Sequence, residues 1–335
     1  MTEAEPSLIA TRQGGAGLLL MNRPRALNAL DLGMIDALAA AIAAWREDAA
    51  LRLVLLEGAG GRAFCAGGDV RRVRQDVLEG RPEAVEAFFA REYAVNAAIA
   101  AFPRPWISLI DGVCMGGGIG VSVHGSHRIV TEHAMLAMPE TAIALFPDVG
   151  TSHVLPRLPD GLGGGLGRWL ALTGARLHGA EAVEAGLATH FVPRERLPAL
   201  RAALIEGGDA AAVAHYAEPV PEGRIAALRP VLARCFGQES LPAILAALEA
   251  EGTEWAAEQL AILRRVSPTS LAVTLELLRR GAALNLTACL EMELALTRRV
   301  TQHPDFAEGV RAVLVDKDQT PRWSPPADAM AFFTP

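Results

Sequence analysis

Short apolar runs alternate with amphipathic helical patterns through the first part of the chain, and this alternation most constrains its fold. Apolar runs predict strands, while apolar residues recurring every three or four positions predict helices. Strands are expected at residues 18–21, 51–57, 106–110, 127–131 and 134–138. Helices are expected after Asp31, after Asp69 and over residues 82–101. This order predicts an α/β fold.

The second part of the chain has a different pattern. From Leu197 onward the strand signal fades and long helical patterns replace it. Those helices are expected at residues 224–236, 241–250, 254–265, 270–279 and 287–303. Residues 207–222, rich in Ala, Pro and Gly, form a candidate junction. We therefore expect an α/β core at residues 1–200 and a helical region at residues 201–335, which together make one functional unit.

Composition and charge exclude several classes of protein. The chain has 335 residues, 51% of them hydrophobic, which is enough for a large core. A net charge of −7 argues against nucleic acid as a partner, because binding phosphate backbones requires a concentrated basic surface. Lys317 is the single lysine and follows no glycine-rich loop. A phosphate-binding loop of the G-x-x-x-x-G-K type is therefore impossible, and a catalytic Schiff base is disfavoured.

The cysteines and the apolar segments bear on the cell compartment. The four cysteines, Cys65, Cys114, Cys235 and Cys289, lie too far apart in the sequence for a zinc cluster. Three histidines lie close together in the sequence, at positions 124, 127 and 133, but no acidic residue or Cys stands at a ligand spacing from them. No metal is therefore expected. Residues 1–6 lack the basic residues of a signal peptide. Asp111 and several glycines interrupt the longest apolar stretch, residues 106–123. We expect a cytoplasmic protein with no membrane partner.

Two glycine-rich loops, residues 64–69 and 112–118, each follow an expected strand and lead into a helix. Free N–H groups at a helix start carry partial positive charge. When two such groups from separate loops converge on one oxygen, they form an oxyanion hole. Glycine content alone is more typical of simple tight turns.

A third segment, residues 138–150, places Glu140 and Asp148 eight positions apart in an apolar run. There is no Lys or Arg between Thr131 and Leu155 to pair with them. Burial tends to raise the pKa of such carboxyl groups, which suits them to acid or base chemistry. Taken alone, the segment is equally consistent with a helix cap or a surface turn.

In this order, the three segments resemble the crotonase (enoyl-CoA hydratase/isomerase) superfamily, and the run Arg-Pro-Arg-Ala-Leu-Asn-Ala-Leu at residues 23–30 fits as well. Within the superfamily the chain is most similar to the 3-hydroxyisobutyryl-CoA hydrolases. The narrower match rests on residues 66–69, 91–93, 115–118, 138–150 and 306–325. The resemblance extends from about Leu18 to Pro325.

The resemblance implies a crotonase-like spiral of ββα units with a helical C-terminal region, and hydrolysis of an acyl-CoA thioester. It implies that Gly68 and Gly117 form the oxyanion hole and that Glu140 is the catalytic glutamate. It also implies that Asp148 is a second catalytic carboxylate and that Glu92 contacts the substrate. The positions matching the CoA pocket are Ala26, Leu27, Ala66, Gly67, Asp69 and Val70. No cofactor or metal is implied, because CoA is part of the substrate, and a homo-oligomer fits the family.

The chain also departs from the family pattern. Hydratases of the superfamily carry a second glutamate where this chain has Gly120, so their two-glutamate mechanism is not available in its usual form. The hydrolases usually have glycines and an aromatic residue where this chain has Thr151-Ser152-His153. His153 is more typical of a structural or surface histidine than of a partner to Asp148. Hydration, isomerisation and non-catalytic acyl-CoA binding stay open as alternatives. The nearby arginines at positions 23, 25, 71, 72 and 74 suit the phosphates of CoA.

Overall fold

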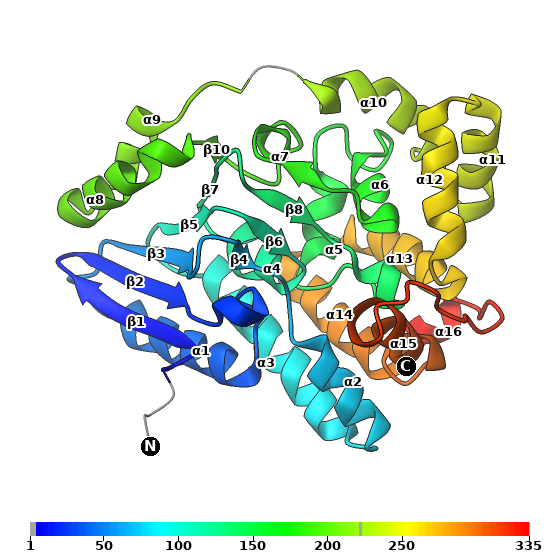
Figure 1. Cartoon of the computed structure of the whole chain (residues 1–335), viewed down its shortest axis with the longest axis horizontal. Coiled ribbons are helices and arrows are strands. Elements are labelled where there is room, and N and C mark those ends of the chain that lie inside the picture. The colour runs from blue at the N-terminus through cyan, green and yellow to red at the C-terminus, as the bar shows by residue number, and fades with distance from the viewer. Residues whose placement is uncertain (1–4, 221–222, 335) are drawn as a thin grey trace. The chain divides into compact units, whose positions relative to one another are not determined.

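A computed structural model of the chain describes residues 5–220 and 223–334 (Figure 1). The chain divides into two compact units whose segments are interleaved along the sequence. The first unit comprises described residues in 5–68, 94–136 and 177–224, and the second comprises residues 69–93, 137–176 and 225–334. The first four residues of the 1–6 segment and the last two of the candidate junction lie outside the described residues. The expected division at residue 200 stays a prediction.

A six-stranded sheet with the order β1-β2-β3-β5-β7-β10 forms the frame of the first unit (Figure 1). Its strands are β1 (Leu8–Gln13), β2 (Ala16–Met21), β3 (Leu53–Gly58), β5 (Trp106–Ile110), β7 (His127–Val130) and β10 (His190–Phe191). β1 pairs with β2 in antiparallel fashion, and the other pairs are parallel. Parallel strands need crossover connections, which is what the alternating pattern predicted.

Helices cover the sheet of the first unit. α8 (Leu197–Gly207) and α9 (Val213–Tyr216) pack their apolar side chains against β2, β3, β5 and β7. α1 (Leu32–Arg46) contacts β1 and β2 and begins where Asp31 Oδ1 accepts a hydrogen bond of 2.8 Å from the Met34 N–H. The remaining helices of this unit are η1 (Pro24–Ala26), α4 (Gly117–Val123), α7 (Ala180–Glu184), η4 (Arg194–Arg196) and η5 (Ala210–Ala212).

A smaller sheet has the order β4-β6-β8-β9. Its strands are β4 (Ala63–Cys65), β6 (Val113–Met115), β8 (Met135–Ala137) and β9 (Leu177–His178). β4 and β6 lie inside the two segments that were expected to be loops only, and they pair in parallel. Three residues are too few for a sequence pattern to identify as a strand.

The second unit is almost entirely helical, as predicted for the C-terminal part of the chain (Figure 1). Its earlier helices are α2 (Val70–Leu78), the first twelve residues of α3 (Pro82–Ala100), η2 (Glu140–Ile143), α5 (Thr151–Val154), η3 (Leu155–Arg157) and α6 (Leu166–Thr173). Its later helices are α10 (Arg224–Cys235) beyond its first residue, α11 (Leu241–Glu251), α12 (Glu254–Arg265), α13 (Pro268–Gly281), α14 (Leu286–Val300), α15 (Pro304–Val310), η6 (Arg311–Val315) and α16 (Met330–Phe333).

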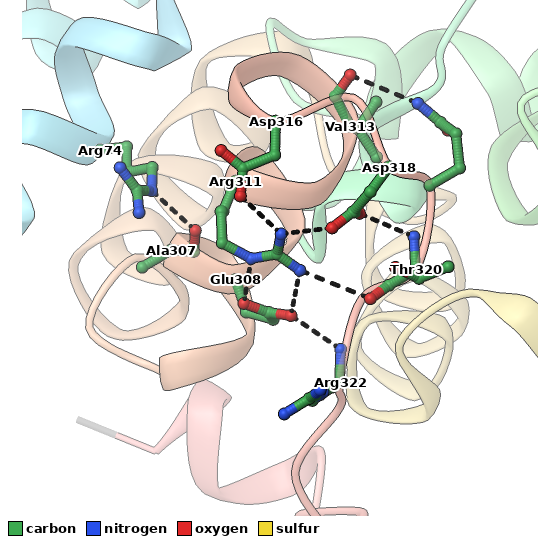
Figure 2. Close-up of polar contacts among 10 residues, drawn as sticks. Arg74, Ala307, Glu308, Arg311, Val313, Asp316, Asp318, Thr320 and Arg322 are labelled. Atoms are coloured by element: carbon green, nitrogen blue, oxygen red, sulfur yellow. Dashed lines mark hydrogen bonds and ion pairs between the residues drawn. The ribbon is translucent and has the colours of Figure 1, made fainter.

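Arg311 organises the chain that follows α15 (Figure 2). Its guanidinium donates two hydrogen bonds of 2.8 Å to Glu308 and one each to Asp316 (2.7 Å) and Asp318 (2.6 Å). Glu308 in turn accepts a 2.9 Å hydrogen bond from the Arg322 N–H. One planar guanidinium thus fixes three carboxylates and gives the segment after η6 a defined path.

In residues 5–220 and 223–334, no helix combines the length and the apolar character that crossing a membrane requires.

Candidate active site

Four of the buried acidic side chains of the second unit stand apart because they have no cation beside them among the described residues: Glu92 on α3, Glu140 at the start of η2, Asp148 after η2, and Glu293 on α14. Their residues are 3%, 6%, 4% and 0% exposed. Burying an ionised carboxylate is costly unless a cation pairs with it. Within the described part of the chain, none of the four forms an ion pair with an Arg, Lys or His side chain. Buried, unpaired acids of this kind mark a candidate catalytic site.

Glu140 opens the short 3₁₀ helix η2, and just beyond its end the Leu145 N–H donates a 3.0 Å hydrogen bond back to the Glu140 carbonyl oxygen. In the described residues, the Glu140 Oε2 and the Glu92 Oε1 are both buried and have no hydrogen-bond partner. Buried polar atoms are nearly always satisfied in folded proteins. Two unsatisfied carboxyl oxygens therefore indicate atoms that are kept for a ligand or a water molecule.

Asp148 has a partner. The Tyr93 hydroxyl donates a 2.7 Å hydrogen bond to the Asp148 Oδ2, and both residues are buried. The Asp148 carbonyl oxygen accepts hydrogen bonds from Thr151, 2.9 Å from its N–H and 2.8 Å from its hydroxyl. Side chain and backbone of Asp148 are thus both fixed. The sequence drew attention to the Arg91-Glu92-Tyr93 run but gave no role to Tyr93.

Burial shifts the proton affinities of these acids upward. Desolvation, followed by repulsion from Asp148, raises the pKa values of Glu140 and Glu92 well above the ordinary value. Desolvation raises the pKa of Asp148 to about 6, against the opposing effect of the Tyr93 hydrogen bond. Carboxyl groups with pKa values moved toward neutrality can both accept and donate protons at physiological pH. The upward direction agrees with what the sequence predicted for Glu140 and Asp148.

Glu293 was missed by the sequence analysis. It accepts hydrogen bonds from the Gly150 N–H (2.7 Å), the Ser152 N–H (3.2 Å) and the Ser152 hydroxyl (2.5 Å). Desolvation raises the pKa of Glu293 to about 8. The sequence did contain a signal for its burial, because Glu293 occupies the apolar face of α14, three residues from both Leu290 and Leu296.

The two glycine loops meet within the first unit. A Cβ placed on Gly67 would lie 3.3 Å from the Met115 carbonyl oxygen and 3.8 Å from the Gly117 nitrogen. Gly117 is the first residue of α4, so its N–H has no acceptor inside the helix. The structure therefore brings together the loops of the two predicted oxyanion-hole residues, Gly68 and Gly117, whose role stays a prediction.

Gly118 explains why the second loop needs a run of glycines. A Cβ at this position would lie 2.3 Å from the Cys65 carbonyl oxygen, a distance that no side chain can occupy. Without a side chain, α4 approaches the end of β4 closely. The glycines of this loop therefore set the spacing between the two loops.

The expected CoA-pocket residues fall into two groups. Ala26, Leu27, Ala66 and Gly67 lie in the first unit, where the Ala66 N–H donates a 3.0 Å hydrogen bond to the Leu27 carbonyl oxygen. The two sequence segments are thus neighbours in the first unit. Asp69 and Val70, at the start of α2, belong to the second unit. That these residues bind CoA stays a prediction.

Several of the arginines considered for CoA phosphates have partners within the protein. Arg71 donates a 2.5 Å hydrogen bond to the Leu314 carbonyl oxygen. Arg74 donates one of 2.8 Å to the Ala307 carbonyl oxygen (Figure 2). Arg23 lies 3.1 Å from an Asp31 oxygen. These contacts show that the three arginines have structural roles.

The histidines also have neighbours of their own. The His153 Nδ1 lies 3.2 Å from the Leu284 carbonyl oxygen, which supports the structural interpretation of this residue. The His127 ring stacks on His190, with centroids 5.6 Å apart.

Comparison with known proteins places the chain in a family. The enoyl-CoA hydratase/isomerase family matches residues 16–330. The 3-hydroxyisobutyryl-CoA hydrolase, mitochondrial, of Xenopus tropicalis is 42% identical, over 97% of this chain and 86% of that protein. The 3-hydroxyisobutyryl-CoA hydrolase 1 of Arabidopsis thaliana is 41% identical, over 96% of this chain and 88% of that protein.

A solved structure gives the same result for the fold. The structure described as a carnitinyl-CoA dehydratase from Mycobacterium thermoresistibile has a TM-score of 0.92 and is 38% identical, covering 98% of this chain and 96% of that one. The fold and the buried acids thus define a crotonase-fold protein with a helical C-terminal region, as expected. This chain belongs to the enoyl-CoA hydratase/isomerase family, and it is similar over nearly its whole length to 3-hydroxyisobutyryl-CoA hydrolases.

Proposed function

We propose that the chain is an acyl-CoA thioester hydrolase whose substrate is 3-hydroxyisobutyryl-CoA. The observation that carries the proposal is the pair of buried carboxyl groups, Glu140 and Asp148, one with an unsatisfied oxygen and the other held by Tyr93. The similarity to hydrolases of that name supports the choice of substrate.

The proposed reaction begins with polarisation of the thioester. The Gly68 and Gly117 N–H groups hold the carbonyl oxygen and stabilise the negative charge that develops on it. Removing one such donor typically lowers the rate by roughly 10²–10³-fold. These two donors are backbone groups, so this step uses no side chain.

Glu140 is the group proposed to start the attack. Its carboxylate either attacks the acyl carbon, giving a mixed anhydride that water opens, or removes a proton from an attacking water. In both routes water supplies the new acyl oxygen, the carbon–sulfur bond breaks, and the CoA thiolate leaves and takes up a proton. Neither route requires a cofactor.

Asp148 and Glu92 are proposed to act on the acyl group of the substrate. A carboxyl group held by the Tyr93 hydroxyl and with a pKa of about 6 can transfer a proton or bind the 3-hydroxyl of the substrate. The Glu92 Oε1, which has no partner among the described residues, offers a second acceptor for that hydroxyl. Together they account for selection of a 3-hydroxyacyl group.

Hydration or isomerisation of an enoyl-CoA is the second candidate. A solved structure 38% identical to this chain is described as a dehydratase, so overall similarity alone does not separate the two chemistries. Gly120, at the position where hydratases of the superfamily carry a second glutamate, favours hydrolysis. A non-catalytic acyl-CoA-binding protein is a third candidate, and the presence of both Glu140 and Asp148 argues against it.

A thiol-release assay tests the proposal. The protein is incubated with 3-hydroxyisobutyryl-CoA, an enoyl-CoA and a saturated acyl-CoA, and free CoA is titrated with a thiol reagent. We expect the protein to release CoA, and to release it faster from the 3-hydroxyacyl ester than from the other two esters. Conversion of the enoyl ester without thiol release would establish hydratase or isomerase chemistry instead, and binding without turnover would establish the non-catalytic candidate.

The setting of the reaction is part of the same proposal. We place it in valine catabolism, in a cytoplasmic protein with no membrane or nucleic-acid partner. A homo-oligomer is compatible with the family.

A further inference from the structure

Of the four buried acids that form no ion pair within the described residues, the mechanism above leaves Glu293 without a task. This residue lies on α14 and is fully buried. Its carboxyl group is directed at the backbone that follows Asp148, where the Gly150 N–H, the Ser152 N–H and the Ser152 hydroxyl all reach it. Ser152 belongs to the Thr151-Ser152-His153 segment, which departs from the hydrolase pattern.

The backbone between Asp148 and Ser152 is strained. Val149 has a φ of 53° and Gly150 a φ of 81°, so two successive residues are left-handed. For a β-branched residue such as Val149 this conformation is a genuine outlier, and strained residues persist only where their surroundings hold them. The turn therefore needs an external support.

Glu293 supplies that support from a different part of the chain. The Gly150 N–H, the Ser152 N–H and the Ser152 hydroxyl converge on the carboxyl group of Glu293. The Thr151 N–H between them donates to the Asp148 carbonyl oxygen. The same turn fixes Asp148 through the two Thr151 hydrogen bonds to the Asp148 carbonyl oxygen. Asp148 is thus held directly by Tyr93, through its carboxyl group, and indirectly by Glu293, through the turn whose Thr151 bonds the Asp148 carbonyl oxygen.

We propose that Glu293 is a positioning residue for Asp148, which it aims by clamping the Gly150–Ser152 turn. The inference rests on the proposed function, because it assigns Glu293 to the reaction that Asp148 serves. A simple packing role would affect stability alone, whereas a positioning role affects the Tyr93–Asp148 hydrogen bond and turnover in a protein that remains folded.

Tyrosine carbon NMR tests the clamp without reference to activity. The chain has two tyrosines, Tyr93 and Tyr216, so protein labelled at the tyrosine ¹³Cζ gives two signals that Y216F assigns. The Tyr93 signal reports on its hydrogen bond to Asp148. We expect this signal to shift or broaden in Glu293→Ala and in Ser152→Ala, while the Tyr216 signal stays unchanged. Ser152→Ala keeps the carboxyl group, so a shift there reflects position rather than lost charge.

Kinetics supply the second readout. We expect kcat for thiol release to fall by roughly 10–100-fold in Glu293→Ala, with KM within about twofold of wild type, because a misplaced catalytic group costs turnover rather than binding. Glu293→Gln keeps an acceptor for the Gly150 N–H, so its loss should be smaller. Glu291→Ala, an exposed change on the same helix, should behave as wild type.

The possible outcomes distinguish failure of the clamp from failure of the proposed function. Unchanged Tyr93 signals and unchanged kcat in folded Glu293→Gln and Ser152→Ala variants would overturn the clamp, and these two milder variants decide the matter if Glu293→Ala does not fold. A wild-type protein that releases no thiol would overturn the proposed function instead, and the NMR experiment would still test the clamp.

Discussion

Tyr93 and Asp148 are joined by a buried hydrogen bond of 2.7 Å between the Tyr93 Oη and the Asp148 Oδ2. The two residues lie 55 positions apart in the sequence, one on α3 and the other after η2. The Tyr93 hydroxyl is a donor to an acid that has no cation beside it among the described residues. Burial raises the pKa of Asp148, and the hydrogen bond from Tyr93 opposes that rise.

Tyr93→Phe should raise the pKa of Asp148, because the hydrogen bond from the Tyr93 hydroxyl lowers it in the wild type. A hydrogen bond to a charged group is worth about 1.5–3 kcal/mol, which corresponds to about one to two pKa units. The limb of the kcat/KM pH profile that belongs to Asp148 should move to higher pH, whether the carboxyl group acts as acid or as base. Tyr216→Phe, the other tyrosine, serves as the matched control, and an unmoved profile in Tyr93→Phe would contradict the assigned contact.

Gly309→Ala should disturb the turn that carries Glu140. A Cβ at Gly309 would lie 2.6–2.8 Å from backbone atoms of Ile143, the last residue of η2. Backbone cannot yield as a flexible side chain does, so we expect destabilisation by about 1–3 kcal/mol and a loss of thiol-release activity. Denaturant unfolding and the thiol assay measure both. Gly163→Ala, with no atom within 4 Å of the added Cβ, should leave stability and activity near wild type.

Arg311→Ala should loosen the chain after η6. Its guanidinium bonds Glu308, Asp316 and Asp318, and Glu308 holds the Arg322 N–H. We expect residues 316–322 to open more readily, seen as faster amide hydrogen exchange by mass spectrometry. Arg264→Ala removes an exposed pair with Glu249 and should leave that exchange unchanged. Full protection of residues 316–322 in Arg311→Ala would show that other contacts fix this segment.

The pKa of Glu293 gives stability a pH dependence of known sign. In the folded chain its pKa is raised to about 8, above the ordinary value of 4.5. Between these two values the folded state binds more protons than the unfolded state, so the free energy of unfolding falls as pH rises, by up to about 1.4 kcal/mol per pH unit. Glu293→Gln cannot titrate, so urea unfolding between about pH 5 and pH 8 should show a flatter dependence. Exposed Glu291→Gln should keep the wild-type slope, and a Glu293→Gln slope equal to it would refute the raised pKa.

The parts of the fold that the sequence predicted are those with a strong local pattern. The continuous apolar runs of β2, β3 and β5 were identified because parallel strands are buried on both faces. β1 was missed because it is an edge strand with one buried residue, and β9 and β10 because each has two residues. In the second unit, α2, α3 and α10 to α14 were predicted from the sequence, whereas α6 and the shorter helices η2, α5, η3, α15, η6 and α16 were not.

Part of the candidate site could be predicted from the sequence. Glu140 and Asp148 stood out as two acids in one apolar run without a basic residue, and the family resemblance supplied the roles expected for them, for Glu92 and for the two glycines. The roles of Tyr93 and Glu293 depend on helices distant in sequence from Asp148, and only the fold brings these side chains to it. The strained φ of Val149 likewise has no signature in the sequence, because the contacts that hold it are tertiary.

Release of free CoA from 3-hydroxyisobutyryl-CoA by the wild type, Glu140→Gln and Asp148→Asn tests the central claim most directly. The claim is that these two buried acids hydrolyse the thioester. We predict that the wild type releases thiol and that each variant, with an unchanged circular dichroism spectrum and melting curve, is slower by roughly 10²–10⁴-fold. Thiol release at the wild-type rate in either folded variant would contradict the account.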